Sequence, residues 1–486
     1  MTVLWLAASV YGQINQLEVK PFNRQMLPST INESYSSAAL DRDLRNQYEQ
    51  QHLPGLATCI VKNGEIIWHG CYGYADIDKN LPVSDSTTFV LASVSKTFTG
   101  TALMQLWQQG LIDLDADVNI YLPAGVTVIN PWHPETAITC RMLLTHTSSI
   151  YEKDLYTLVS WGQDSPISLA SYIPNYFTPG GSYYDSTNYS KDIPGSSYLY
   201  NNRAVALAGY LVELVSGSSF AHYCDEHIFK ALNMSNTSWF LNGLDSSNLA
   251  VPYTYLNDTH YPYGYYSFPF YPCALLKSSI ADLARYLMAY INKGELDGVR
   301  ILDESTVALM NTVQYPKVAA QMGLVWFLDN QGETPYWYHS GGMYGCHTRI
   351  SYYPEEKIGI IILINLDHWL VDLQPIYSAM EQYALSYVTE TIDPIQSPPV
   401  VFNLEQNYPN PFNSITSINY QLAMTNKVEL CIYNLRGQKV VTLISGKQPA
   451  GIYTIQWDAS AFASGVYLYR LQAGTYTQTK KLLLLR

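Results

Sequence analysis

The hydrophobic pattern of the chain is clearest in a hairpin near its start. Apolar and β-branched residues dominate 57–62 and 65–72, and Asn63-Gly64 lies between the two runs. Asn-Gly between such runs is the strongest short-range signal for a hairpin. Runs of similar character at 323–328, 348–353 and 358–365 predict further strands of one sheet.

Between and after these strands the apolar residues recur with a helical period. This period predicts helices that begin at Ser93 and that cover 140–147, 203–215, 279–291 and 369–385. Gly110 and Gly217 follow two of them as natural stop signals. We therefore expect an α+β fold for residues 40–385, in which an antiparallel sheet is flanked by helices and joined to a helical subdomain.

Two segments of this domain are rich in tyrosine. Residues 151–195 combine Tyr with Ser, Gly and Pro, which is typical of a long loop with short helices. Residues 252–272 place many aromatic residues among prolines. This second segment is either a loop anchored by aromatic side chains or a wall of a substrate cleft, and the sequence favours neither interpretation.

The pattern changes after residue 385. Residues 386–401 are rich in proline and predict a linker. Short alternating strands are then expected at 427–433, 439–443, 451–457, 466–471 and 476–480. Several strands at this spacing predict a small all-β, immunoglobulin-like sandwich over residues 402–486.

The first residues of the chain have a different character. Residues 1–13 are apolar with small residues toward their end, which predicts the remnant of a secretory signal peptide, with a disordered tail as the alternative. Residues 14–39 are polar and are expected to be a leader into the first domain. No later run of 18 or more apolar residues follows, so we expect no transmembrane span.

Composition and charge narrow the possible partners. Charged residues make up 14% of the 486 residues, the net charge is −13, and no Lys/Arg cluster is present, which argues against binding of nucleic acid. The low charge and the 42 tyrosines suit an exported protein. Seven scattered cysteines are not a disulfide framework. His222, Cys224 and His227 lie in a helical apolar pattern without a second ligand cluster, so no metal or cofactor is expected.

The candidate chemistry starts at Ser93-Val-Ser-Lys96. Serine and lysine three residues apart lie on one face of a helix, and a partly desolvated lysine can take the proton of a serine hydroxyl. Ser93 would also lie near a helix N-terminus, which favours developing negative charge. The alternative is that Ser93 only caps the helix and that Lys96 is a solvated surface charge.

Two further clusters extend this candidate site. Tyr200 stands just before the predicted helix at 203–215 and could shuttle a proton, while the carboxamide of Asn202 could orient a substrate. The second cluster is His339-Ser-Gly-Gly342, where small residues permit close approach of a substrate, and the N–H groups of Ser93 and Gly342 could form an oxyanion hole. Taken alone, the first cluster is better explained as a helix entry capped by Asn202, and the second as a turn before a strand.

In this order the motifs resemble the serine β-lactamase-like and penicillin-binding-protein-like hydrolases, in particular the class C β-lactamase-related branch. The family carries Ser-x-x-Lys, Tyr-x-Asn and Lys-Thr-Gly or His-x-Gly, which read here as Ser93-Val-Ser-Lys96, Tyr200-Asn-Asn202 and His339-Ser340-Gly341. Residues 54–56, 72–76, 143–148 and 294–302 also resemble the family. The resemblance covers roughly residues 40–385.

The resemblance implies an exported serine hydrolase that forms an acyl-enzyme on Ser93. Lys96 and Tyr200 would share base and acid duty, and Asn202, His339, Ser340 and Gly341 would bind a small ester, a peptide with D-residues, an amide or a β-lactam. The alternative is a catalytically weak penicillin-binding or surface-displayed binding module.

The chain also departs from the family pattern. His339 replaces the lysine of true class C β-lactamases, and Ser149 and Ala274-Leu275 replace usual glycines. These differences point to the esterase, D-aminopeptidase or carboxypeptidase-like relatives and make β-lactam hydrolysis the less favoured activity.

The end of the chain carries a second resemblance. Residues 407–413, Trp457-Asp458, 465–467 and the terminal 480–486 resemble a type A sorting domain of the type IX secretion system. This implies contact with that secretion machinery and a secreted or cell-surface location. The alternative is a generic binding sandwich.

Overall fold

The computed structural model describes residues 35–152, 158–367, 371–387, 403–422, 426–448, 451–474 and 476–485. The chain forms two compact units, residues 1–387 and 388–486, and each is described by itself. The expected signal remnant, most of the leader and most of the linker lie outside the described residues.

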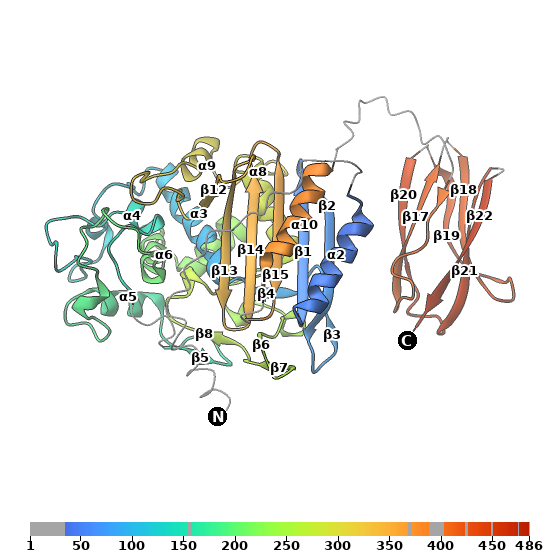
Figure 1. The fold of residues 1–486 in the computed structure, drawn as a ribbon, viewed down its shortest axis with the longest axis horizontal. Coiled ribbons are helices and arrows are strands. Elements are labelled where there is room, and N and C mark those ends of the chain that lie inside the picture. Colours follow the sequence, from blue (N-terminus) through green and yellow to red (C-terminus); the bar gives the residue numbers. More distant parts are fainter. Residues whose placement is uncertain are drawn as a thin grey trace. The chain divides into compact units, whose positions relative to one another are not determined.

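A seven-stranded antiparallel sheet is the centre of the first unit (Figure 1). Its strand order is β12-β13-β14-β15-β1-β2-β3, so the first and last thirds of the unit share one sheet. The strands are β1 (Gly55–Lys62), β2 (Glu65–Asp76), β3 (Leu81–Pro82), β12 (Phe327–Asp329), β13 (Tyr336–Met343), β14 (Cys346–Tyr353) and β15 (Ile358–Ile364).

The predicted hairpin is confirmed by the pairing of β1 with β2. Asn63 and Gly64 both have positive φ, 53° and 83°, which a two-residue hairpin turn that follows the twist of the strands requires. The central strand β15 is buried on both faces, and this explains its continuous apolar run.

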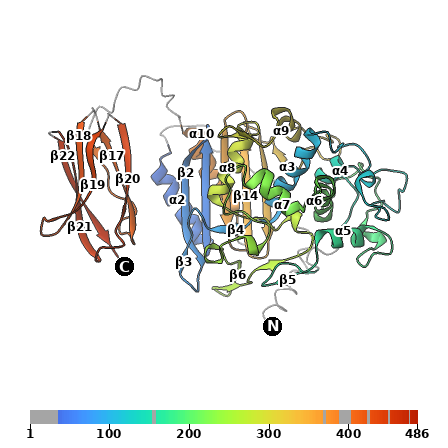
Figure 2. The same cartoon turned by 180° about the vertical axis from the view of Figure 1, so that it is seen from behind.

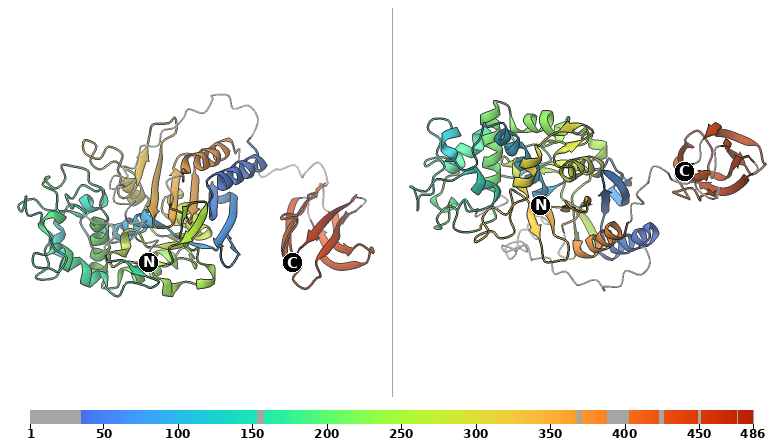
Figure 3. Two further views of the ribbon diagram at one scale, coloured as in Figure 1. Left: turned by 60° about the horizontal axis from the view of Figure 1, so that its bottom comes forward. Right: turned by 90° about the horizontal axis from the view of Figure 1, so that it is seen from above.

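Helices cover both faces of this sheet. On one face lie α2 (Ser37–Gln50) and α10 (Leu373–Ser386), which contact each other and cover a core that includes Leu44, Ile362 and Tyr377 (Figure 1). On the other face lie α8 (Ile280–Ile291) and, beyond it, α3 (Ser95–Gln108) (Figure 2). Figure 3 shows the same layers from two further directions. The predicted α+β class is confirmed.

Beside the sheet lies a mainly helical region. It holds α4 (Cys140–Leu144), α5 (Leu169–Phe177), α6 (Asn202–Ser216), α7 (Phe220–Cys224) and α9 (Glu304–Met310). Its α6 packs on α3 and ends at Gly217, which has a φ of 70°. Among the described helices, no single one is long and apolar enough to cross a membrane; only α6 taken with residues 220–229, across an 80° bend, reaches that length and hydropathy.

Two predicted elements are shorter than expected. The strand predicted at 323–328 begins only at Phe327, because Leu324 and Val325 donate backbone hydrogen bonds to Met310 and Leu144 in the helical region. The helix predicted at 140–147 ends at Leu144, and His146 then takes a positive φ of 57°. Both differences arise from tertiary contacts that a local hydrophobic period does not encode.

Most of the aromatic side chains of the tyrosine-rich segment 252–272 are buried and anchor it. It forms β6 (Tyr253–Leu256), β7 (Thr259–Pro262) and β8 (Tyr266–Ser267), and the last of these pairs with β5 (Ser160–Trp161). Phe268 and Phe270 are 2% and 0% exposed. Strand β4 (Thr88–Val90) lies just before Ser93 in the chain and pairs with β9 (Lys277–Ser279).

The second unit is a small β-sandwich, as predicted. One sheet has the order β16-β17-β20 and the other β19-β18-β21-β22. Strands β16 and β17 add to the five predicted strands. The bounds are β16 (Asn403–Leu404), β17 (Ile415–Leu422), β18 (Asn426–Asn434), β19 (Lys439–Gln448), β20 (Gly451–Asp458), β21 (Gly465–Ala473) and β22 (Tyr476–Leu484).

Candidate active site

Ser93 lies in a short 3-10 turn, Ala92–Val94, between β4 and α3. Ala92 has a φ of 45°, a left-handed conformation that costs a non-glycine residue about 1–2 kcal/mol. The turn places Ser93 at the N-terminal end of α3, as the sequence predicts. Strain directly before a candidate nucleophile is a recurrent feature of functional sites.

The sheet holds this turn from the other side. The Thr348 hydroxyl on β14 donates to the Leu91 carbonyl oxygen at 2.7 Å. Gly341 on β13 lies so close that a Cβ there would be 2.4 Å from the Leu91 oxygen and 3.0 Å from the Ser93 nitrogen. Only glycine fits this gap, and the absence of a side chain brings β13 against the serine.

Lys96 is fully buried and points at Ser93. Its Nζ donates to Ser93 Oγ at 2.9 Å, to Asn202 Oδ1 at 2.7 Å and to the Cys273 carbonyl oxygen at 2.9 Å. Burial lowers the pKa of Lys96 to about 8, although the negative charge of Glu152 acts in the opposite direction. A lysine with this pKa has a neutral fraction near pH 7 and can accept a proton. The solvated-surface interpretation of Lys96 is therefore wrong.

Tyr200 reaches the same serine from the start of α6. Its hydroxyl hydrogen-bonds with Ser93, and Lys96 Nζ lies 4.9 Å from the centre of its ring. Burial of the hydroxyl raises the pKa of Tyr200 above its ordinary value, so the phenol stays protonated. Tyr200 as a whole residue is 36% exposed.

The start of α6 is capped by Asn201 rather than Asn202. The Asn201 side chain accepts from the Ala204 N–H at 2.8 Å. The Asn202 side chain therefore does not cap the helix and contacts the site instead. Its Oδ1 accepts from Lys96, and its Nδ2 donates to Glu152 Oε2 at 2.8 Å. Glu152 also pairs with the buried Arg203 at 2.6 Å. This ion pair fixes which end of the Asn202 amide faces Lys96.

Two buried histidines lie close enough to Lys96 for its charge to lower their pKa, and both are neutral. His339 on β13 donates from Nδ1 to the Ser340 carbonyl oxygen at 2.7 Å, and burial, with the charge of Lys96, lowers its pKa to about 3. The His146 ring lies 4.3 Å from that of Tyr200, and its Nδ1 accepts from the Asn201 N–H. Burial lowers the pKa of His146 as well. The third motif therefore carries no positive charge.

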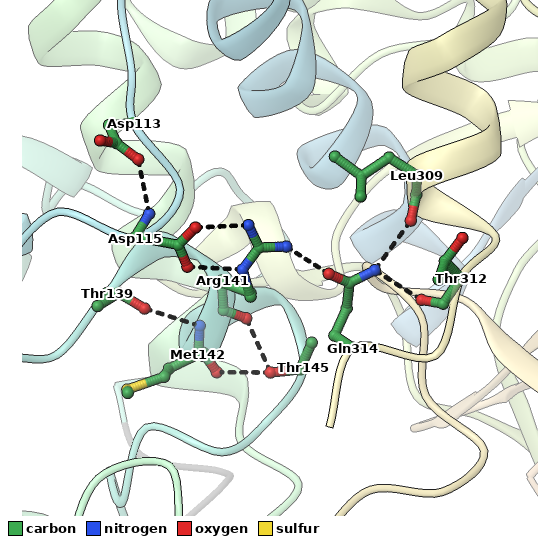
Figure 4. Close-up of polar contacts among 9 residues, drawn as sticks. All are labelled: Asp113, Asp115, Thr139, Arg141, Met142, Thr145, Leu309, Thr312 and Gln314. Carbon is green, nitrogen blue, oxygen red and sulfur yellow. Dashed lines mark hydrogen bonds and ion pairs between the residues drawn. The ribbon is translucent and has the colours of Figure 1, made fainter. Parts of the chain in front are cut away.

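A peripheral ion pair anchors the helix that leads to His146 (Figure 4). Arg141 on α4 makes two contacts of 2.7 Å with Asp115 and also donates to Gln314. The Thr139 hydroxyl caps the same helix by accepting from the Met142 N–H. Since α4 has only five residues, these contacts rather than helix propensity hold it in place.

One edge of β13 is open beside Ser93. Strand β12 pairs only with Tyr336–Tyr338, and no described strand pairs with residues 339–343 on that side. Gly342, predicted to offer its N–H to an oxyanion, lies in this stretch and is exposed. An extended substrate can add to such an edge by backbone hydrogen bonds.

The structure thus brings together Ser93, Lys96, Tyr200 and Asn202, with the strand that carries His339, Ser340, Gly341 and Gly342 beside them. Sequence reasoning missed Glu152 and Arg203. Glu152 lies in a segment with no period, but a charged residue inside the apolar pattern of 203–215 was a usable signal for Arg203.

A group of potential metal ligands lies around His222. His222 lies near Asp225 and Glu226 at the surface, with ligand atoms within 4.8 Å of one another. Both carboxylates pair with Lys230, and Cys224 is buried away from them. We assign no metal to this cluster.

Two family models match the chain. Residues 40–384 match the model described as Beta-lactamase, and residues 406–485 match the Secretion system C-terminal sorting domain.

Among curated proteins, Protein flp of Staphylococcus aureus (strain MRSA252) is 26% identical over 349 residues, which are 68% of this chain and 63% of that protein. Penicillin-binding protein 4* of Bacillus subtilis (strain 168) is 25% identical, over 66% of this chain and 70% of that protein. The chain thus spans less than two thirds of the length of the Staphylococcus relative.

Solved structures show the same fold. The octameric penicillin-binding protein homologue from Pyrococcus abyssi aligns with a TM-score of 0.56 at 22% identity, covering 92% of this chain and 96% of that one. A class C beta-lactamase aligns with a TM-score of 0.58 at 17% identity, covering 72% and 96%. At these identities the likeness concerns the fold alone.

Proposed function

Since the chain belongs to the beta-lactamase family, we propose that it is a serine hydrolase that forms an acyl-enzyme on Ser93. One observation carries the proposal: a fully buried Lys96, with its pKa lowered to about 8, donates to Ser93 Oγ at 2.9 Å. Burial alone does not mark a base, because Lys277 is also buried with a pKa lowered to about 8 and donates to the Trp239 and Leu275 carbonyl oxygens. The contact of Lys96 with a serine hydroxyl is what a general base requires.

In the acylation step Ser93 Oγ attacks the substrate carbonyl carbon, and its proton passes to the neutral amine of Lys96. The carbonyl π bond opens to an oxyanion, which the N–H groups of Ser93 and Gly342 would stabilise. When the oxyanion collapses, the bond to the leaving group breaks. The Tyr200 phenol gives its proton to the departing oxygen or nitrogen and recovers one from the Lys96 ammonium.

Deacylation reverses these roles. Water attacks the acyl carbon, and its proton passes through the Tyr200 hydroxyl to the neutral amine of Lys96. When the oxyanion collapses, the bond to Ser93 Oγ breaks and the Lys96 ammonium returns the proton to Ser93. The Glu152–Arg203 pair keeps Asn202 Oδ1 on Lys96 through both steps, and the second hydrogen on Nδ2 can be offered to a substrate carbonyl.

For the substrate we propose small esters first, then D-residue peptides or amides, and β-lactams last. A neutral His339 supports this order, because a lysine there would attract the carboxylate that β-lactams carry and a neutral imidazole does not. His339, Ser340 and Gly341 would line the side of the substrate that faces β13.

Residues 406–485 are a secretion-system C-terminal sorting domain, and the protein is secreted or displayed at the cell surface. We propose that this domain contacts the type IX secretion machinery and that the hydrolase acts on substrates outside the outer membrane.

A serine-directed probe tests the proposal. Wild-type protein treated with a fluorophosphonate should carry the label on Ser93 by mass mapping, and Ser93→Ala should lose both the label and the hydrolysis of p-nitrophenyl acetate. Ser171→Ala removes an exposed serine on α5 and should behave as wild type. An unlabelled Ser93, together with a Ser93→Ala protein as active as wild type, would refute the mechanism.

A further inference from the structure

The open strand β13 leads directly to a group of aromatic side chains. Two residues after Gly342, the Tyr344 ring lies 5.5 Å from that of Trp161 and 5.3 Å from that of Tyr263, between centroids. Trp161 is 41% exposed, and Tyr263 and Tyr344 are partly exposed. We call Trp161, Tyr263 and Tyr344 the aromatic platform.

The platform is built into the hairpin that positions β13. Tyr266, which is buried beneath it, donates from its hydroxyl to the Tyr344 carbonyl oxygen at 2.8 Å. Tyr266 also pairs with Trp161 through β8 and β5, so the strand pairing fixes the tryptophan. A Cβ on Gly345, in the β13–β14 turn, would lie 2.2 Å from Cβ of Pro252. The tyrosine-rich segment 252–272 therefore holds both the turn and the platform.

The aromatic platform lies within reach of an acyl group bound to Ser93. Strands rise about 3.3 Å per residue, so Tyr344, the first residue of the turn after β13, begins about 7 Å from Gly342. An extended acyl group that leaves Ser93 along the open edge of β13 reaches the rings after a few bonds. The platform itself contains no charged side chain, and the carboxylate of Asp367 interacts with the Tyr263 hydroxyl.

From these observations we propose that the aromatic platform is an acyl-group subsite that binds an uncharged aromatic group of the substrate. This proposal rests on the proposed function, because it assigns a subsite to the acyl-enzyme at Ser93. Rings that are already fixed lose little conformational freedom on binding, and aromatic pairs favour offset or edge-to-face contacts at these separations.

The test compares two esters of the same leaving group. Wild type should show a kcat/KM for p-nitrophenyl 4-phenylbutyrate at least tenfold above that for p-nitrophenyl butyrate, which has the same chain without the ring. Trp161→Ala should reduce this ratio at least tenfold, and Trp161→Phe should restore most of it. Trp132→Ala removes another exposed tryptophan, one that stacks with Lys191, and should keep the wild-type ratio.

The outcomes separate the two proposals. If Ser93 is labelled by a fluorophosphonate but the ratio is the same in wild type and Trp161→Ala, the subsite is refuted and the serine mechanism stands. If Ser93 carries no label and neither ester is hydrolysed, the proposed function fails and the subsite fails with it. If Trp161→Ala hydrolyses neither ester, the ratio of Ser93 labelling rates for phenylalkyl and methyl fluorophosphonates is measured in place of the ratio of kcat/KM values. Equal labelling ratios in wild type and variant refute the subsite.

Discussion

The lowered pKa of Lys96 makes the pH dependence of the reaction the sharpest test of the mechanism. If the neutral amine is the base, kcat/KM rises with pH along a limb centred at about 8. About one tenth of the amine is then neutral at pH 7 and about nine tenths at pH 9, so the rate should increase about tenfold between them. With an unshifted lysine, the neutral fraction at pH 7 would be about 300-fold smaller.

Other titrating groups near Lys96 would place this limb elsewhere. Burial lowers the pKa of His339 to about 3 and that of His146 below its ordinary value, and burial raises the pKa of the Cys273 thiol to about 11. The pKa of Tyr200 is raised as well. A limb near pH 8 is therefore specific to Lys96 among these neighbours. Burial also lowers the pKa of Lys277 to about 8, but its Nζ donates to the Trp239 and Leu275 carbonyl oxygens and its charge interacts with Asp164, so removal of Glu152 distinguishes the two lysines.

Glu152→Gln tests whether the limb belongs to Lys96, because it changes the charge next to that lysine. The negative charge of Glu152 raises the pKa of Lys96, and its removal leaves the positive Arg203 without its carboxylate. Both changes favour the neutral amine, so the limb should move to lower pH. Glu135→Gln removes an exposed carboxylate and should leave the limb in place.

The assay is initial-rate hydrolysis of p-nitrophenyl acetate from pH 5.5 to 9.5, with the Ser93→Ala rate subtracted at each pH. A wild-type limb below pH 6.5 or above pH 9.5 contradicts the role of Lys96. An unshifted limb in Glu152→Gln contradicts the coupling to Glu152.

Three further predictions concern the strand and the second domain. His339→Lys should raise the ratio of nitrocefin to ester hydrolysis, because it adds a positive charge that can attract the β-lactam carboxylate, and a lower ratio would contradict this account of specificity. Gly341→Ala should lower kcat by about 100-fold, because a Cβ 2.4 Å from the Leu91 oxygen forces β13 away from Ser93. An unchanged kcat in a variant with the wild-type circular dichroism spectrum would contradict this requirement for close contact. Deletion of residues 402–486 should retain the protein in the periplasm. The purified first unit should stay active, since the two units have separate cores. Unchanged secretion, measured by immunoblot of the medium, would contradict the sorting role.

The tyrosine-rich segment 252–272 bears on the choice of substrate. Its sequence is equally compatible with packing and with a cleft wall, and the structure shows that most of its aromatic residues are buried. Only Tyr263 joins the partly exposed platform with Trp161 and Tyr344, which come from two other segments. The packing interpretation therefore holds for most of the segment, and the cleft interpretation survives as a proposal at one end of it.

Local sequence determined much of this protein. Asn63-Gly64 determined the first hairpin, because its positive φ angles suit these residues, and Gly110 and Gly217 determined two helix ends for the same reason. The order of Ser93, Lys96, Tyr200, Asn202 and His339 was enough to indicate a serine hydrolase, and the turn signals after residue 402 were enough to indicate a sandwich.

The tertiary structure alone decided the electrostatics of the site. A serine three residues before a lysine occurs in solvated helices as well, and only the burial of Lys96 beneath Tyr200, Asn202 and the Cys273 carbonyl lowers its pKa. Glu152 and Arg203 are 51 positions apart in the chain, so no local pattern could reveal that they meet beside Asn202. Desolvation and long-range pairing depend on the whole fold, and they turn a common motif into a reactive one.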